Sequence, residues 1–517
     1  MPTPEKDIIN FSLNRSISRR DLLKVSGALF ISGAGIVLLG CGKKEEKISV
    51  RELQSESNLV LIERDNDFFD NDHVIGAKDG NFFITSGRGI SAKDINSGSK
   101  LWSTELKDSI KDGLVRPNGN LFITSDILGS TGNAYIIDGK TGSIVKKTSL
   151  SFHRFPGYLL PSILEDKYVE GTWIPSLEPF DKNKSKNYQP GFLNLDNLRF
   201  LTGFSSQSVL RPFAVTGAVA LFSTENDTVV AFDINTKSKL WEGNYGWLSF
   251  NNPSSSIVIA GKTLDEEDRL FKFAALDSET GKSLWDWEWR GGGHNKKSRG
   301  ESGSYTENQQ QLIYADSSGF YVLETKLDVD YSGRFSSSDK TLKIKKRRAN
   351  DGKVLWEKRL GGGSFFGNIY TGGGRVQGSF KDNSLAWLDE KQVVIAHIGG
   401  VTVIDSETGD ILDNARLPNK IRDPRNIIDE SSGRFDRRKV TTNDQQIFIG
   451  LDDQLVSIDR STGLLRLEML FKHPNPRDTL GREEIKELAI SDGRLVVITG
   501  NSDSVFTRRM YRFQIKK

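Results

Sequence analysis

A short phrase returns along the chain, and no other feature constrains the fold as strongly. Its fullest form is A-A-L-D-S-E-T-G-K-S-L-W (residues 274–285), where an Asp precedes a Gly by four residues and a Trp by eight. Eight copies align, the last without Gly or Trp, and their Asp slots fall at positions 94, 138, 233, 277, 348, 405, 459 and 514. The shortest interval, 44 residues, fits one four-stranded repeat unit. The 95-residue interval between 138 and 233 either contains an insertion or hides a degenerate extra copy.

Each slot of the phrase has a structural role. An Asp side chain accepts hydrogen bonds from backbone N–H groups two or three residues on and so closes a turn. Gly adopts the positive φ that other residues avoid, and Trp can fill the space between two twisted sheets. Residues before each Asp alternate between apolar and polar, as in a strand. We therefore interpret ten residues as scaffold, with the four Trp buried between sheets: Asp94, Trp102, Asp138, Asp233, Trp241, Asp277, Trp285, Trp356, Asp405 and Asp459.

The phrase resembles the repeat of the PQQ-like β-propeller family, A-x-D-x-x-T-G-x-x-x-W, and the resemblance covers about residues 58–517. It implies an all-β fold, a single eight-bladed propeller of four-stranded antiparallel blades with an insertion at 151–207. The last copy supplies only three strands and ends at Lys517. Because an unpaired edge invites aggregation, we expect residues 58–64, or as second choice 47–53, to pair with the strand around Met510–Ile515. That pairing would close the ring.

The resemblance leaves the function open, because one fold serves several functions. The family includes quinone-dependent dehydrogenases and also non-catalytic lipoproteins such as the BamB-type outer-membrane assembly factor. The dehydrogenases carry a vicinal Cys pair beside the quinone and a calcium-binding set of Glu, Asn and Asp, whereas this chain has one Cys and no set that can be matched. We therefore favour a non-catalytic protein-binding scaffold without PQQ. A PQQ- or calcium-dependent oxidoreductase with a diverged site and a polysaccharide-binding propeller stay open as alternatives.

The first forty residues predict export to the cell envelope. Arg19 and Arg20, in S-R-R-D-L-L-K, resemble a twin-arginine signal, and an apolar run of fifteen residues follows them. That run is too short to span the ~30 Å core of a bilayer comfortably. The run ends in L-L-G-C at Cys41, which resembles a lipobox, so the resemblance implies cleavage after residue 40, acylation of Cys41 and a tether at 41–57. The alternative is an uncleaved anchor with an incidental thiol. Either way the rest would face the periplasm or the exterior, and the choice between inner and outer membrane stays open.

One segment offers a candidate metal site. Its sequence, D-V-D-Y-S-G-R-F-S-S-S-D (residues 328–339), follows the spacing of a calcium loop. The ligands would be Asp328, Asp330, Ser332, Asp339 and the backbone carbonyl of Arg334. The flanking residues have the pattern of strands and not of EF-hand helices, so the alternative is a polar hairpin tip.

The charge balance bears on the class of partner. The whole chain carries a formal net charge of +3, from 71 Lys and Arg against 68 Asp and Glu. A nearly balanced surface argues against nucleic acid. We expect a monomeric propeller that is tethered to the membrane by its lipid and binds a protein or peptide of the envelope.

Overall fold

A computed structural model gives the fold of the chain. The chain divides into two units, residues 1–47 and 48–517. The structure describes residues 51–516, except for 54–56, 69–71, 128–130, 155–167, 174–188, 205–209, 225, 227, 252–255, 266–269, 291–302, 316–318, 333–334, 369–384, 389–390, 398–399, 419–427, 430–433, 436, 472–482 and 502–507. All strands named below belong to the second unit.

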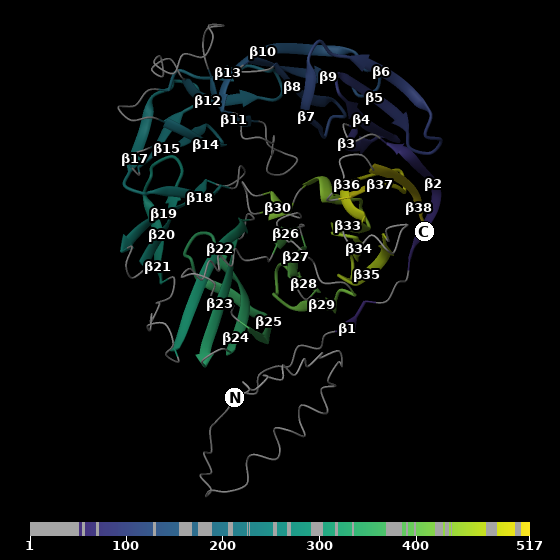
Figure 1. The fold of residues 1–517 in the computed structure, drawn as a ribbon. Coiled ribbons are helices and arrows are strands. Elements are labelled where there is room, and N and C mark those ends of the chain that lie inside the picture. Colours follow the sequence, from purple (N-terminus) through teal and green to yellow (C-terminus); the bar gives the residue numbers. More distant parts are fainter. Residues whose placement is uncertain are drawn as a thin grey trace, which may run out of the picture. The chain divides into compact units, whose positions relative to one another are not determined.

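Successive antiparallel strands form a series of sheets, which we number 1 to 9 in chain order (Figure 1). Sheet 1 contains β3 (Asp72–Lys78), β4 (Asn81–Ser86), β5 (Gly89–Asp94) and β6 (Lys100–Glu105). Sheet 2 contains β7 (Ser109–Val115), β8 (Leu121–Ile127), β9 (Thr131–Ile137) and β10 (Ile144–Arg154). Sheet 3 contains β11 (Tyr168–Trp173), β12 (Gln189–Asn194) and β13 (Phe200–Leu201), and it is hydrogen-bonded to sheet 2 through β10 and β11.

The next three sheets each have four strands. Sheet 4 contains β14 (Leu210–Thr216), β15 (Val219–Thr224), β16 (Val229–Asp233) and β17 (Lys239–Gly243). Sheet 5 contains β18 (Trp247–Asn251), β19 (Ile257–Asp265), β20 (Leu270–Asp277) and β21 (Ser283–Arg290). Sheet 6 contains the longest strands, β22 (Gly303–Ala315), β23 (Gly319–Ser332), β24 (Phe335–Arg348) and β25 (Val354–Asn368).

The N-terminal segment contributes to two of the last three sheets. Sheet 7 contains β26 (Leu385–Leu388), β27 (Gln392–His397), β28 (Gly400–Asp405), β29 (Ile411–Arg416) and the early strand β1 (Arg51–Glu52). Sheet 8 follows a small hairpin of β30 (Ile428–Asp429) and β31 (Arg434–Phe435) and the 3-10 helix η3 (Arg437–Lys439), and it contains β32 (Val440–Thr442), β33 (Gln446–Leu451), β34 (Gln454–Asp459) and β35 (Leu465–Leu470). Sheet 9 contains β36 (Glu483–Ser491), β37 (Arg494–Asn501), β38 (Arg508–Ile515) and the early strand β2 (Leu59–Phe68).

The count of eight copies from the sequence is not confirmed, because the interval between 138 and 233 contains a further copy. Asn194 ends β12, and its backbone N–H donates to the carbonyl of Arg199 at 2.9 Å, while that of Leu198 donates to the carbonyl of Asn194 at 2.8 Å. Asp94 and Gly98 make the same pair of bonds in sheet 1. Part of the expected insertion at 151–207 is therefore β11 to β13 of sheet 3.

Buried apolar side chains join each sheet to the next. Nine such clusters occur among the described residues, and each combines side chains of two neighbouring sheets. One of them joins Val74 and Phe82 of sheet 1 to Ala489 and Val496 of sheet 9, so the last sheet packs on the first. No sheet of the described residues closes on itself. The succession is held together by the side chains between the sheets.

The predicted pairing of the N-terminal strand with the last strand is confirmed. Strand β2 runs antiparallel to β38, with Leu59 opposite Ile515, and the backbone N–H of Lys516 donates to the carbonyl of Asn58 at 2.8 Å (Figure 1). Sheet 9 thus obtains its fourth strand from the start of the chain. In the second-choice segment, residues 51–52 form β1 and pair with sheet 7 instead, and residues 47–50 lie outside the described part of the chain.

Candidate functional site

The Asp of the repeat closes a turn. In sheet 5, Oδ1 of Asp277 accepts hydrogen bonds from the Thr280 hydroxyl at 2.6 Å and from the Thr280 backbone N–H at 2.8 Å. These bonds favour the carboxylate, so the Thr280 hydroxyl above all holds the pKa of Asp277 below its usual value. Hydrogen bonds from the turn likewise lower the pKa of Asp94, Asp138, Asp233 and Asp459. These carboxylates therefore stabilise the turns by accepting hydrogen bonds within them.

The Trp of one sheet packs on the Gly turn of the next sheet. A Cβ atom added to Gly281 of sheet 5 would lie 2.5 Å from Cδ2 of Trp241, which belongs to sheet 4. Gly281 also has a φ of +68°. The same arrangement places Trp102 on Gly142, Trp285 on Gly352 and Trp356 on Gly409. At these four turns, Gly is therefore needed both for its backbone conformation and for the indole that lies against it.

Each indole also donates a hydrogen bond to the residue that follows the Asp slot of the next copy. Nε1 of Trp241 donates to the carbonyl of Ser278 at 2.8 Å. The other three pairs are Trp102 to Gly139 (3.0 Å), Trp285 to Ala349 (2.8 Å) and Trp356 to Ser406 (3.4 Å). Trp356 is buried, whereas the other three rings are half-buried, so the expectation of burial is met in full at one position only.

Two copies that lack Gly are consistent with this requirement, because they also lack the indole. Leu198 and Lys237 occupy the Gly slots of sheets 3 and 4 with φ of +51° and +63°. The preceding sheets present Lys146 and Thr202 at the Trp position, and not an indole. Since the Trp position before these turns holds no indole, a side chain fits there, although its positive φ carries backbone strain.

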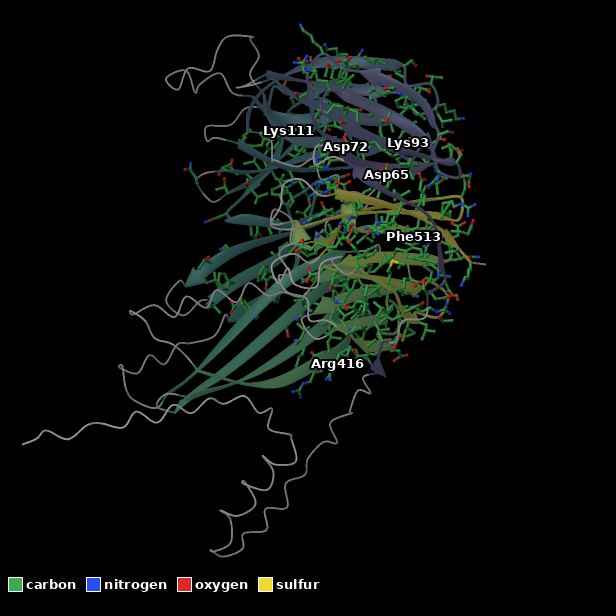
Figure 2. The ribbon with its side chains drawn as sticks, turned by 45° about the vertical axis from the view of Figure 1, so that its right-hand side comes forward. Asp65, Asp72, Lys93, Lys111, Arg416 and Phe513 are labelled. Carbon is green, nitrogen blue, oxygen red and sulfur yellow. The ribbon has the colours of Figure 1, made fainter. Side chains whose placement is uncertain are left out.

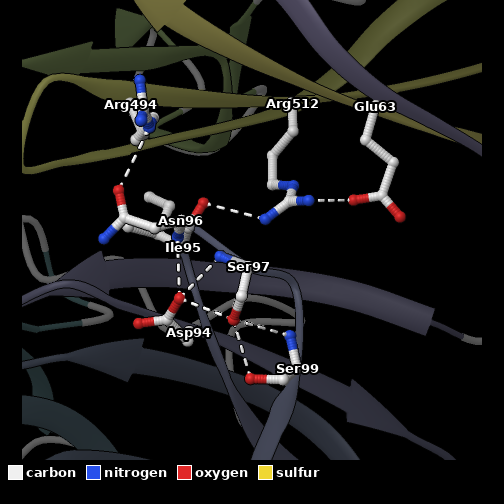
Figure 3. A network of polar contacts seen from close by, with 8 residues as sticks. All are labelled: Glu63, Asp94, Ile95, Asn96, Ser97, Ser99, Arg494 and Arg512. Atoms are coloured by element: carbon white, nitrogen blue, oxygen red, sulfur yellow. Dashed lines mark hydrogen bonds and ion pairs between the residues drawn. The ribbon is translucent and has the colours of Figure 1, made fainter.

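Other polar side chains replace Trp at three junctions. Arg116 donates to the carbonyl of Leu195 at 2.7 Å, and Nε2 of Gln392 donates to that of Arg460 at 2.9 Å. Between sheets 9 and 1, Arg512 donates to the carbonyl of Ile95 at 3.1 Å (Figure 3). Each acceptor directly follows an Asp slot, so the backbone geometry of the junction is kept while the donor changes.

The junction between sheets 9 and 1 includes the N-terminal strand. Arg512 of β38 also forms an ion pair with Glu63 of β2, and Nε of Arg494 donates to the side chain of Asn96 at 3.1 Å (Figure 3). A Cβ on Gly98 would lie 3.1 Å from the Arg512 guanidinium, which takes the place that an indole has elsewhere. Nothing in the local sequence around Arg512 reveals this role, because its partners are more than 400 residues away.

A buried carboxylate of β36 reinforces this junction. The Glu487 side chain is 1% exposed; it accepts a hydrogen bond from the backbone N–H of Val74 at 2.6 Å and contacts His73 Nδ1 at 2.8 Å. Arg508 lies 3.3 Å from the same carboxylate. A buried carboxylate with these partners is compensated and ties the two sheets together. Among the described residues, no group of three or more His, Cys, Asp or Glu side chains is arranged to hold a metal ion.

The outer strands carry a repeated exposed apolar position. It lies one residue before the Trp slot, and the side chains there are 39–60% exposed: Leu101, Val145, Leu240, Leu284, Leu355 and Leu412. In sheets 1, 4, 5 and 6 these strands lie at one edge of the sheet, whereas β10 also pairs with β11 and β29 also pairs with β1. Such edges are suited to pairing with another extended chain.

The candidate calcium segment lies mostly in a β-hairpin. Residues up to Ser332 belong to β23 and residues from Phe335 onwards to β24, with Asp328 opposite Asp339 and Asp330 opposite Ser337. Arg334 lies outside the described residues. The strand flanks are those of the hairpin alternative, and calcium binding by this segment stays a prediction.

The predicted leader residues, Arg19, Arg20 and Cys41, lie outside the described part of the chain. Within the described residues, the structure contains no helix with the length and apolar character required to traverse a bilayer.

Residues 55–148 match the family model described as outer membrane protein assembly factor BamB. They comprise all of β2 and of sheet 1 and most of sheet 2, including the first two Asp turns and the first Trp–Gly contact. This part of the chain is similar to PQQ-like β-propeller repeats of the BamB type. A search of the curated proteins gives no match.

Solved structures match most of the chain, but with low sequence identity and low TM-scores. BamB from Moraxella catarrhalis is 13% identical over 88% of this chain and 99% of its own, with a TM-score of 0.32. Sqt1 from Saccharomyces cerevisiae is 10% identical over 89% of this chain and 100% of its own, with a TM-score of 0.36.

Proposed function

We propose that the chain is a non-catalytic, protein-binding scaffold of the cell envelope. The observation that carries this proposal is the match of residues 55–148 to a family described as an outer membrane protein assembly factor. The turn contacts of the repeat Asp residues and the sheet contacts of its Trp residues support it, because they give these residues structural roles.

The scaffold would be a propeller of nine blades in which β2 closes the ring. Support comes from the apolar cluster between sheets 9 and 1 and from the Arg512–Glu63 ion pair beside it. A propeller presents a broad face of loops and a series of outer strand edges, and both suit a protein or peptide partner.

We also propose that the chain reaches the envelope as a lipoprotein. Arg19 and Arg20 would direct its export, and acylation of Cys41 would hold it at the membrane. Cys41→Ala should therefore release the protein from the membrane fraction or block its processing, and replacing both arginines by lysine should stop its export. A Cys41→Ala protein that is processed and membrane-bound like the wild type would exclude the lipid anchor.

The rival oxidoreductase function is tested by reconstitution. We expect the purified full chain, supplied with PQQ and calcium, to show neither a bound-quinone absorption band nor reduction of a redox dye with alcohol or sugar substrates. Quinone-dependent dye reduction would replace the scaffold proposal with an enzymatic one.

A further inference from the structure

The outer edge of sheet 7 already receives an extended segment of the chain. Strand β1 pairs in parallel with β29, with Arg51 opposite Ala415 and Glu52 opposite Arg416. The backbone N–H of Leu53 continues the ladder by donating to the carbonyl of Arg416 at 3.1 Å. In Figure 2, Arg416 lies beside the short purple strand at this edge. The edge thus provides backbone groups that an added strand can use.

An apolar site adjoins this edge. The Leu53 side chain is 5% exposed, and it belongs to the cluster that contains Val403, Ala415 and Leu417 of sheet 7 together with side chains of sheet 8. A strand edge that supplies hydrogen bonds and an adjacent pocket that takes one side chain are the two components of recognition by strand addition. Both components are present here, and residues 51–53 occupy them.

The segment that occupies the site is short and separable from the rest of the fold. Strand β1 has two residues, whereas β2 has ten residues and its own pairing with β38. Between β1 and β2, the backbone N–H of Asn58 donates a hydrogen bond to the carboxylate of Glu468 in sheet 8 at 2.7 Å. Release of residues 51–53 would therefore leave β2 and its contacts in place.

We propose that the outer edge of sheet 7 is a binding site for an extended segment of a partner protein, and that residues 51–53 fill it in the absence of the partner. The partner segment pairs with β29 and places an aliphatic side chain in the position of Leu53. This inference deepens the proposed scaffold function and rests on it for the natural partner, while the site itself can be tested alone. Residues 51–53 belong to the same chain, so their effective concentration at the edge is high. The partner segment must therefore displace them.

The test uses a fluorescent peptide with the sequence of residues 49–54, S-V-R-E-L-Q, and the full chain carrying Leu53→Asp. The substitution removes the apolar side chain from the cluster and opens the edge. We expect the peptide to bind this variant at least about tenfold more tightly than the wild type, because the fraction of open sites rises. Fluorescence anisotropy measures the affinity, and a peptide with Asp in place of Leu should not bind.

Leu101→Asp is the matched control, because Leu101 is 51% exposed on the outer strand of sheet 1 and the chemical change is the same. It should leave peptide binding at the wild-type level. Equal affinity of the Leu53→Asp and Leu101→Asp chains, or binding of the Asp peptide, would overturn the proposal. If Leu53→Asp lowers the melting temperature strongly, Leu53→Ala replaces it with the same expected order of affinities.

Two further outcomes distinguish a partner site from a dimer interface and from an edge that serves no envelope protein. A wild-type dimer that dissociates in the Leu53→Asp variant would overturn the proposal by showing that the occupant is a second copy of the chain. Peptide binding in the variant without any envelope protein that competes for it would support the site and refute the scaffold function. The two proposals therefore fail separately.

Discussion

Gly281→Ala tests whether the indole of one sheet dictates the glycine of the next. Two terms add at this position: a φ of +68°, which costs a side-chain-bearing residue about 1–2 kcal/mol, and a Cβ placed 2.5 Å from Trp241. Overpacking of this kind costs a further ~1–3 kcal/mol. Gly217 is the matched control, because its φ is +55° and a Cβ there would meet nothing within 4 Å. We expect Gly281→Ala to destabilise the protein by the overpacking term more than Gly217→Ala does.

A double-mutant cycle isolates that term. Trp241→Ala should itself cost about 3–5 kcal/mol, as for other large packed side chains. In its background, Gly281→Ala should cost only the backbone strain, so the two substitutions should be non-additive by about 1–3 kcal/mol. Urea unfolding followed by far-UV circular dichroism gives the free energies. Equal losses for the two Gly variants, or additivity of Trp241→Ala and Gly281→Ala, would refute the reasoning.

Three other perturbations test the closure, the turns and the calcium segment. Deleting residues 57–64 should lower the melting temperature of the whole second unit, because sheet 9 loses its outer strand, whereas deleting 42–46 should not; equal melting of the two deletions would contradict the role of β2. The pKa of Asp277 is lowered in the folded state, so its stabilisation is present above the ordinary value of 3.8 and is lost as the pH falls through the lower folded value. Asp277→Asn should therefore destabilise the protein at pH 7, and its difference from the wild type in urea unfolding should shrink in acid; a constant difference would count against the carboxylate. If the hairpin of β23 and β24 binds calcium, added calcium should raise the melting temperature of the wild type but not that of Asp328→Ala combined with Asp330→Ala; an unchanged wild type would leave the polar hairpin.

The sequence predicted what is local and repeated. The offsets from Asp to Gly and Trp predicted the turn and a packed indole, and the missing outer strand of the last copy predicted the pairing of β2 with β38. The copy at Asn194 could not be recognised from the sequence, because Leu198 stands in its Gly slot, where no indole requires a glycine. The repeat pattern alone does not show which sheet supplies the side chain that lies against a turn. It therefore cannot show that the turn at Leu198 accepts a residue other than Gly.

The candidate binding site was harder to predict for a different reason. Leu53 and Ala415 are far apart in the sequence, and two residues of parallel strand carry no periodic pattern. The replacement of Trp by Arg512 was invisible for a related reason, because its function depends on the return of the chain's start to its end. Contacts between distant segments depend on how the sheets pack on one another, whereas the repeat shows only what recurs within each sheet.

Native mass spectrometry of the protein, purified gently from the cell that produces it, tests the scaffold function most directly. We expect a complex of the chain with another envelope protein in a fixed ratio, without the mass of a bound quinone. A chain that carries a quinone and no protein partner would contradict it.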